Sequence, residues 1–161
     1  IDKDNIEALI HPESIVHGFI EFNDSSQHAF LSQPNMEISI SSVLYKKNRV
    51  NLDRFRLDLR KIMSLNFYDI NKDKFKAIEL AKKSLDYVGL VPAVLNYANE
   101  SMVNLFLKKK ISFTDIVINS ELLMDKFIEE KHNVSNPNIE DITQSFNIID
   151  DYINSFNITI D

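Results

Sequence analysis

The residues best suited to chemistry lie close together near the start of the chain, at His11, Ser14 and His17. A serine beside a histidine could act as nucleophile and base, but the sequence offers neither a third group nor nucleophile-elbow glycines. The two histidines could bind a metal ion, yet no carboxylate completes a recognisable ligand set. Two interpretations remain open: the polar groups could hold an anion, or both histidines could be structural.

A second compact motif, Gln33-Pro34-Asn35-Met36, follows shortly afterwards. Met36 has two interpretations that the sequence leaves open. It could fill a gap in the core of a helix that begins after Pro34, since methionine adapts to irregular spaces. It could instead form the wall of a ligand pocket where the loop meets the helix.

Composition excludes several classes of function for this chain of 161 residues. Its net charge of -6 argues against a nucleic-acid-binding protein, which is usually basic. It has no cysteine for disulfides, no apolar run that could span a membrane and no signal-peptide pattern, so we expect a cytoplasmic protein without a membrane partner. Two glycines are too few for a glycine-rich loop that binds nucleotide phosphates.

The first third of the chain predicts short strands. Residues 15–22 are rich in β-branched and aromatic side chains, and a turn signal at 23–26 followed by residues 27–31 predicts a hairpin. Another short strand is expected at 6–10, ending before Pro12, which lacks a backbone donor. One face of the 15–22 strand is wholly apolar and is expected to be buried; its residues are Val16, Gly18, Ile20 and Phe22.

A helix is expected to follow Asn35, whose side chain suits an N-cap. Its apolar residues recur at the spacing of one helix face, which predicts that they are buried; they are Met36, Ile40, Val43 and Leu44. Residues 46–73 show no clear period and are interpreted as a connector with one strand around 62–67.

Residues 74–161 carry four amphipathic stretches joined by short loops, which predicts an antiparallel four-helix bundle. Gly89 is expected after the C-terminus of the first helix, Pro92 in the first turn of the second, and Ser112 with Asp115 as the cap of the third. The faces expected to be buried are, in order, Phe75, Ile78, Ala81, Leu85 and Val88; Leu95, Ala98, Met102, Leu105 and Phe106; Ile116, Leu123, Met124 and Phe127; Ile142, Phe146, Ile149, Ile153 and Phe156.

Two blocks of sequence resemble one enzyme family. Residues 11–18, which read HPESIVHG, with Glu21-Phe22 and the motif at 33–36, resemble the late catalytic-domain segment of 1-deoxy-D-xylulose 5-phosphate reductoisomerases. Residues 92–100, 106–107 and 111–116 are similar to the helical C-terminal domain of that family. The resemblance covers roughly residues 6–130. Ser39, Tyr97 and residues 71–75 depart from the family pattern.

The resemblance implies an enzyme that converts 1-deoxy-D-xylulose 5-phosphate to 2-C-methyl-D-erythritol 4-phosphate for isoprenoid synthesis. The family is homodimeric and uses NADPH and Mg²⁺ or Mn²⁺, with its cofactor domain and metal ligands upstream of the matched segment. This α+β chain would then comprise the end of a catalytic α/β domain (1–45), a connector (46–73) and the helical bundle (74–161). Alone, we expect it to bind neither NADPH nor a metal ion and to be inactive.

The resemblance also implies a set of substrate contacts, although it implies no catalytic residue in this chain. Ser14 and His17 would lie near the phosphate of the sugar substrate, with His17 acting directly or through water. Pro34 and Met36 would line the pocket beside the substrate backbone. The alternative is a helical protein-interaction module with an appended hairpin and no catalytic role.

Overall fold

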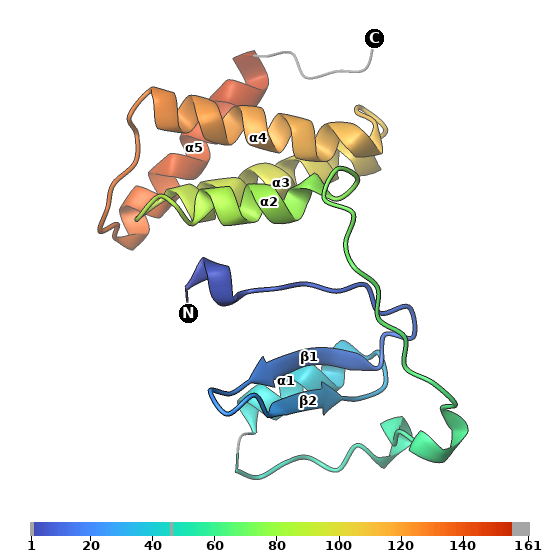
Figure 1. Cartoon of the computed structure of the whole chain (residues 1–161). Helices are drawn as coiled ribbons and strands as arrows, with labels where there is room; N and C mark the ends of the chain where they lie inside the picture. The colour runs from blue at the N-terminus through green and yellow to red at the C-terminus, as the bar shows by residue number, and fades with distance from the viewer. Residues whose placement is uncertain (1, 46, 156–161) are drawn as a thin grey trace. The chain divides into compact units, whose positions relative to one another are not determined.

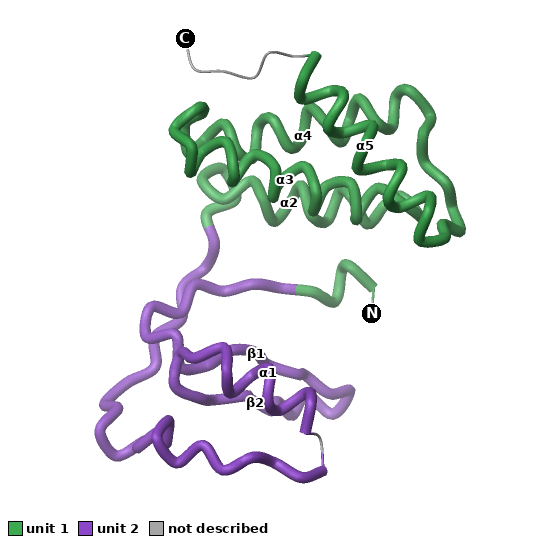
Figure 2. The backbone as a smooth tube through the Cα atoms, turned by 180° about the vertical axis from the view of Figure 1, so that it is seen from behind, with its two compact units in different colours: residues 1–6, 71–161 green, residues 7–70 purple. Residues whose placement is uncertain are grey.

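The computed structural model describes residues 2–45 and 47–155 (Figure 1). The chain divides into two compact units, of which one spans residues 7–70 and the other contains residues up to Ile6 together with the helical segment from Asn71 onward (Figure 2). Among the described residues, the helices of the second unit and one two-stranded antiparallel sheet in the first confirm a mostly helical α+β protein.

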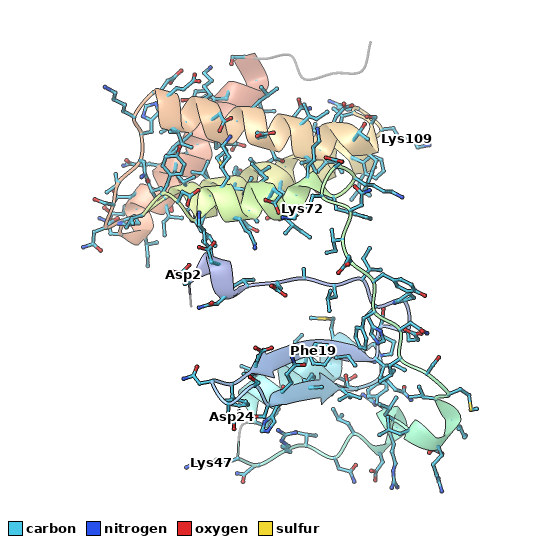
Figure 3. All side chains as sticks on the ribbon, viewed as in Figure 1. Asp2, Phe19, Asp24, Lys47, Lys72 and Lys109 are labelled. Carbon is cyan, nitrogen blue, oxygen red and sulfur yellow. The ribbon has the colours of Figure 1, made fainter. Side chains whose placement is uncertain are left out.

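The predicted hairpin is confirmed in the first unit. Strands β1 (Val16–Glu21) and β2 (Gln27–Leu31) pair antiparallel, with an irregular register between Val16 and Gly18. Asp24, labelled in Figure 3, holds the turn because its Oδ1 accepts hydrogen bonds from the Ser26 N–H at 3.0 Å and the Ser26 hydroxyl at 2.6 Å. Asx turns of this kind explain why the 23–26 segment reverses the chain.

The prediction that one face of β1 is buried is wrong. Ile20 is 63% exposed and Phe22 is 45% exposed, Gly18 is exposed and Val16 is only half-buried. A strand buries its apolar face only where a second layer covers it. The described sheet has two strands, and the residues of β1 are left mainly in solvent.

Helix α1 (Met36–Leu44) begins where Asn35 predicts, because the Asn35 side chain accepts a hydrogen bond from the Glu37 N–H at 2.8 Å. The predicted burial of its apolar face is wrong. No residue of α1 is buried, and the four residues of the predicted face are exposed by half or more; they are Met36, Ile40, Val43 and Leu44. The helical spacing therefore predicts the helix correctly but not a partner for its face.

The two further strands predicted in this unit, at 6–10 and around 62–67, are not formed. One isolated antiparallel bridge forms instead between Ile10 and Tyr68, which exchange two backbone hydrogen bonds of 2.9 Å. The connector instead contains two 3-10 turns, η2 (Asp53–Phe55) and η3 (Leu59–Lys61). Asp58 caps η3 by accepting from the Arg60 N–H at 3.1 Å, so the chain turns just before the segment where the strand was expected.

The second unit contains η1 (Lys3–Asn5) and the helices α2 (Lys76–Ser84), α3 (Val91–Leu107), α4 (Phe113–Glu129) and α5 (Ile139–Ser155). Figure 1 shows α3 beside α2, α4 and α5, and α3 contacts all three. Their shared core includes the fully buried side chains of Met102, Leu123, Phe127 and Ile149. The four predicted helices are thus present, and burial of their common apolar surface stabilises this unit.

The predicted core residues are confirmed to different extents along these helices. All four on α4 are buried, namely Ile116, Leu123, Met124 and Phe127, and Ala98 and Met102 are buried on α3. Of the α5 residues, Ile149 is buried and Phe156 lies outside the described residues. The capping box formed by Ser112 and Asp115 at the start of α4 is confirmed.

The predicted buried face of α2 is wrong. Phe75 and Val88 are exposed, and the side chain that enters the core from α2 is Leu80, which is 6% exposed. The helix ends at Ser84, so residues beyond it no longer follow the helical spacing. Gly89 has a φ of +117°, but it is not at the C-terminus of α2. It lies four residues after the cap of α2 at Leu85 and directly before Leu90, the N-cap of α3.

Candidate functional site

Ser14 lies in a tight turn immediately before β1. Its N–H donates a hydrogen bond to the carbonyl oxygen of His11 at 3.1 Å. Ser14 has a φ of +51°, a left-handed conformation that is uncommon for residues other than glycine. Ser14 is also exposed, so its hydroxyl and the adjoining backbone are accessible to a ligand.

His17 is an exposed residue of β1, three positions after Ser14. Its Nδ1 lies 2.9 Å from the carbonyl oxygen of Ile15, and its ring meets the edge of Phe30 with centroids 6.0 Å apart. A carbonyl oxygen can only accept, so Nδ1 carries the proton of the neutral ring. Nε2 is therefore the ring atom available to a ligand.

The segment with Pro34 and Met36 leaves the sheet at the end where the Ser14 turn enters it. Val16 pairs with Leu31, and the Ser32 N–H donates to the carbonyl oxygen of Ile15 at 3.0 Å. The register of the hairpin therefore brings the start of β1 beside the residues that precede Pro34. All four predicted substrate contacts belong to the unit of residues 7–70.

Pro34 and Met36 are both exposed, and Met36 is 69% exposed as the first residue of α1. The interpretation of Met36 as a core residue is therefore wrong. Its alternative role, as the wall of a ligand pocket, stays a prediction. A hollow in the same unit is lined by Glu37 and residues 50–54 and includes none of the four predicted contacts.

His11 has a structural role that sequence reasoning did not assign. Its side chain is only 7% exposed, and its ring stacks on Phe67 with centroids 4.6 Å apart. His11 Nδ1 lies 2.8 Å from the carbonyl oxygen of Asn66 and 3.0 Å from Glu13 Oε2. The partners Asn66 and Phe67 lie more than fifty positions away, so no local pattern could have revealed these contacts.

Glu13 makes a second set of contacts with the same distant residue. Its carboxylate accepts hydrogen bonds from the Asn66 side-chain amide at 2.5 Å and from the Asn66 N–H at 3.2 Å. These bonds, led by the side-chain amide, lower the pKa of the Glu13 carboxyl below its ordinary value. Glu13 is thus held as an acceptor at neutral pH.

The described residues contain neither a metal-binding cluster nor a membrane-spanning helix. No group of three or more His, Cys, Asp or Glu side chains in residues 2–45 and 47–155 is arranged to hold a metal ion. None of the helices described is both long enough and apolar enough to cross a membrane.

Comparison with known proteins points to one family. The family model described as the DXP reductoisomerase C-terminal domain matches residues 31–149. The 1-deoxy-D-xylulose 5-phosphate reductoisomerase of Crocosphaera subtropica is 41% identical over 145 residues, which cover 90% of this chain and 36% of the relative. The enzyme of Agathobacter rectalis is 35% identical over 153 residues, which cover 95% of this chain and 39% of the relative. The chain therefore spans between a third and two fifths of these relatives.

Solved structures agree with the sequence matches. The Zymomonas mobilis reductoisomerase in complex with NADPH has a TM-score of 0.77 and 29% identity, covering 94% of this chain and 39% of that one. A DOX-P reductoisomerase in complex with NADPH, fosmidomycin and magnesium has a TM-score of 0.80 and 30% identity, covering 91% of this chain and 37% of that one. By sequence and by fold, the chain belongs to the DXP reductoisomerase family, whose C-terminal domain it contains.

Proposed function

We propose that this chain is the C-terminal part of a 1-deoxy-D-xylulose 5-phosphate reductoisomerase, which makes 2-C-methyl-D-erythritol 4-phosphate for isoprenoid synthesis. The observation that carries the proposal is the match of 90% of the chain to a reductoisomerase at 41% identity. A helical interaction module would have no reason to carry the HPESIVHG turn and strand at residues 11–18.

In this proposal, Ser14 and His17 bind the phosphate group of the substrate. A phosphate offers acceptor oxygens, and the exposed Ser14 hydroxyl can donate to one of them. In the neutral His17 ring, the Nδ1 proton is donated to the carbonyl oxygen of Ile15. Nε2 then carries no proton and can only accept a hydrogen bond. His17 therefore reaches the phosphate through a water that donates to both, or directly when the ring is protonated.

Pro34 and Met36 form the neighbouring wall of the pocket, beside the carbon backbone of the sugar. Both side chains are exposed in a segment that adjoins the Ser14 turn through Ser32 and Ile15. An apolar wall beside hydrogen-bonding groups is the usual composition of a small-molecule site. Neither side chain has a proton to transfer, so this wall shapes the pocket and takes no chemical part.

When bound to the full-length enzyme, NADPH would supply a hydride, and Mg²⁺ or Mn²⁺ would act as a Lewis acid. The described residues of this chain contain no group suited to hold the metal ion. In this proposal, as the family resemblance implies, the NADPH and metal sites belong to the part of the enzyme outside the matched segment.

The finer organisation of the protein is also part of the proposal. Residues 1–45 complete the catalytic domain, 46–73 form a connector, and helices α2–α5 form an antiparallel four-helix bundle within 74–161. The enzyme is a cytoplasmic homodimer that acts on a phosphorylated sugar and binds neither nucleic acid nor membrane. The contacts of α3 with α2, α4 and α5 support the bundle, and the net charge of -6 argues against nucleic-acid binding.

The decisive experiment is an assay of the full-length protein that contains this chain. Purified protein with Mg²⁺ or Mn²⁺ should oxidise NADPH only when 1-deoxy-D-xylulose 5-phosphate is present, and NMR should identify 2-C-methyl-D-erythritol 4-phosphate as the product. The 161-residue chain alone is the control and should be inactive. A folded full-length protein that fails to oxidise NADPH in the presence of this substrate would overturn the proposal.

A further inference from the structure

We propose that His11, Glu13 and Asn66 position the phosphate-binding turn of the enzyme, acting through Ser14 rather than by touching the substrate. These three residues are named here the turn clamp. The inference rests on the proposed function, because it assumes that Ser14 binds the substrate phosphate. It assigns a role in substrate binding to a connector residue that is 52 positions away from Ser14 in the sequence.

The turn clamp holds the turn on both sides of Pro12. The carbonyl oxygen of Asn66 accepts a hydrogen bond from His11 Nδ1 at 2.8 Å. The same Asn66 donates to the Glu13 carboxylate from its side-chain amide and its backbone N–H. One residue of the connector therefore fixes the first and third residues of a turn whose fourth residue is Ser14.

Packing and backbone pairing reinforce these contacts. The His11 ring stacks on Phe67, and Ile10 pairs with Tyr68 through two hydrogen bonds of 2.9 Å. His11 is nearly buried, and its Nε2 has no hydrogen-bond partner among the described residues. A buried polar atom without a partner persists only where the surrounding contacts dictate the position of the ring.

Ser14 shows why such support is needed. Its left-handed backbone, with φ of +51°, is unfavourable for a residue with a Cβ atom. Conformations of this kind persist where the surrounding structure over-determines them, and they are common at ligand-binding sites. The turn clamp and the Ser14 N–H bond to the His11 carbonyl oxygen supply that constraint, so the Ser14 hydroxyl is held in place before a ligand arrives.

The inference predicts a specific kinetic change in the full-length enzyme. Asn66→Ala should raise KM for the sugar phosphate and Ki for inorganic phosphate in parallel, each by about fivefold, which corresponds to about 1 kcal/mol. Because the turn clamp acts on the phosphate site alone, KM for NADPH should be unchanged and kcat should change less than KM. A purely structural role would lower the melting temperature and the active fraction while leaving both KM values at their wild-type levels.

Matched variants separate the hydrogen bonds of the turn clamp from its packing. His11→Phe keeps an aromatic ring on Phe67 but removes the donor, so it should raise KM as Asn66→Ala does. His11→Asn places an amide donor near the position of Nδ1 and should restore most of the phosphate affinity. Asn51→Ala removes a comparable hydrogen bond, to the Asp53 N–H at 2.9 Å, and should leave KM unchanged.

A second measurement uses the folded full-length enzyme without substrate. In hydrogen exchange, the amide protons of Ile10 and Tyr68 should lose protection in Asn66→Ala and keep it in Asn51→Ala. This result tests the turn clamp as a structural unit without any activity. Unchanged protection in Asn66→Ala would contradict the inference, whatever the kinetics show.

Ser14→Ala, assayed in parallel, distinguishes failure of this inference from failure of the proposed function. If Ser14→Ala raises KM and Ki but Asn66→Ala and His11→Phe do not, the turn clamp has no positioning role and the inference is overturned. If Ser14→Ala leaves KM and Ki unchanged, Ser14 does not bind the phosphate. The assignment of Ser14 and the positioning role of the turn clamp are then both wrong.

Discussion

A Cβ atom added to Gly89 would lie 2.0 Å from the carbonyl oxygen of Val134. The contact joins the turn before α3 to the loop between α4 and α5, which are far apart in the sequence. Asn133 links the same two segments by hydrogen bonds. Its side chain accepts from the Leu90 N–H at 2.8 Å and donates to the carbonyl oxygen of Val88 at 3.0 Å. Gly89 is therefore required here both by its φ of +117° and by the absence of space for a side chain.

Gly89→Ala should destabilise the helical unit by roughly 2 kcal/mol or more, because it adds a steric clash to an unfavourable backbone conformation. Urea unfolding of the 161-residue chain, followed by circular dichroism, would measure the change. Gly18→Ala is the matched control: no atom lies within 4 Å of a Cβ built at Gly18, so its effect should stay within about 0.5 kcal/mol. Equal unfolding midpoints for the two variants would contradict the prediction.

The capping box at the start of α4 should make a contribution to stability that depends on pH. The Ser112 hydroxyl donates to Asp115 Oδ2 at 2.6 Å, and the Ser112 N–H donates to the same oxygen at 2.8 Å. These bonds lower the pKa of the Asp115 carboxyl below its ordinary value of 3.8, because they favour the charged form. The stabilisation is therefore fully present above that value and is lost as the pH falls through the lowered pKa of the folded state.

An NMR titration of the Asp115 carboxyl carbon should give a midpoint below the ordinary value. In Ser112→Ala the hydroxyl donor is lost, so the midpoint should move back up towards 3.8 although the N–H donor remains. Asp24, whose pKa is lowered by the hydroxyl and the N–H of Ser26 in the hairpin turn, provides a carboxyl signal that this substitution should not move. An Asp115 midpoint at or above its ordinary value in the wild-type chain would refute the assignment.

The helical segment 74–161 should fold without residues 1–73. Its core is made within the segment, by side chains such as Met102, Leu123 and Phe127, all fully buried. The segment loses the ion pair between Lys3 and Asp86, which is partly exposed and contributes little to stability. Circular dichroism should show a helical spectrum and a cooperative thermal transition. Residues 1–73 should show no such transition, because a lone hairpin is marginal in water; a coil spectrum from 74–161 would disprove the prediction.

Sequence patterns identified the helices more reliably than their buried faces, and α1 and α4 show why. Both were located by a capping residue and by helical spacing, which are local properties. The face of α4 is buried as expected because α3 and α5 cover it, whereas no residue of α1 is buried. Burial depends on which other elements are present to pack against a face, and that information is not local.

The same distinction applies to the candidate site. Ser14 and His17 could be selected from residue type and from the resemblance of one short motif. The burial of His11 and its contact with Asn66 could not be predicted from the sequence, because they depend on a contact between segments more than fifty residues apart. No sequence pattern indicates the left-handed φ of Ser14 either, because serine stands where glycine would be the usual residue.

The last prediction concerns His17 in the full-length enzyme. His17 is an exposed residue of β1 that anchors its Nδ1 on the Ile15 carbonyl oxygen at 2.9 Å, which leaves Nε2 for the phosphate or a bridging water. Phosphate binding is needed in the ground state as well as in the transition state, so its loss mainly weakens substrate binding. His17→Ala should therefore raise KM by about tenfold, equivalent to about 1.4 kcal/mol, with a smaller fall in kcat.

His28→Ala is the matched control for this variant. His28 is also an exposed histidine of the hairpin and also makes an edge contact with a phenylalanine, Phe22, at 4.9 Å between centroids. Loss of an aromatic contact alone should therefore lower the melting temperature of both variants similarly, whereas only His17→Ala should change KM. Because KM and the melting temperature are measured on the same preparations, a folded His17→Ala enzyme with an unchanged KM would exclude His17 from the phosphate site.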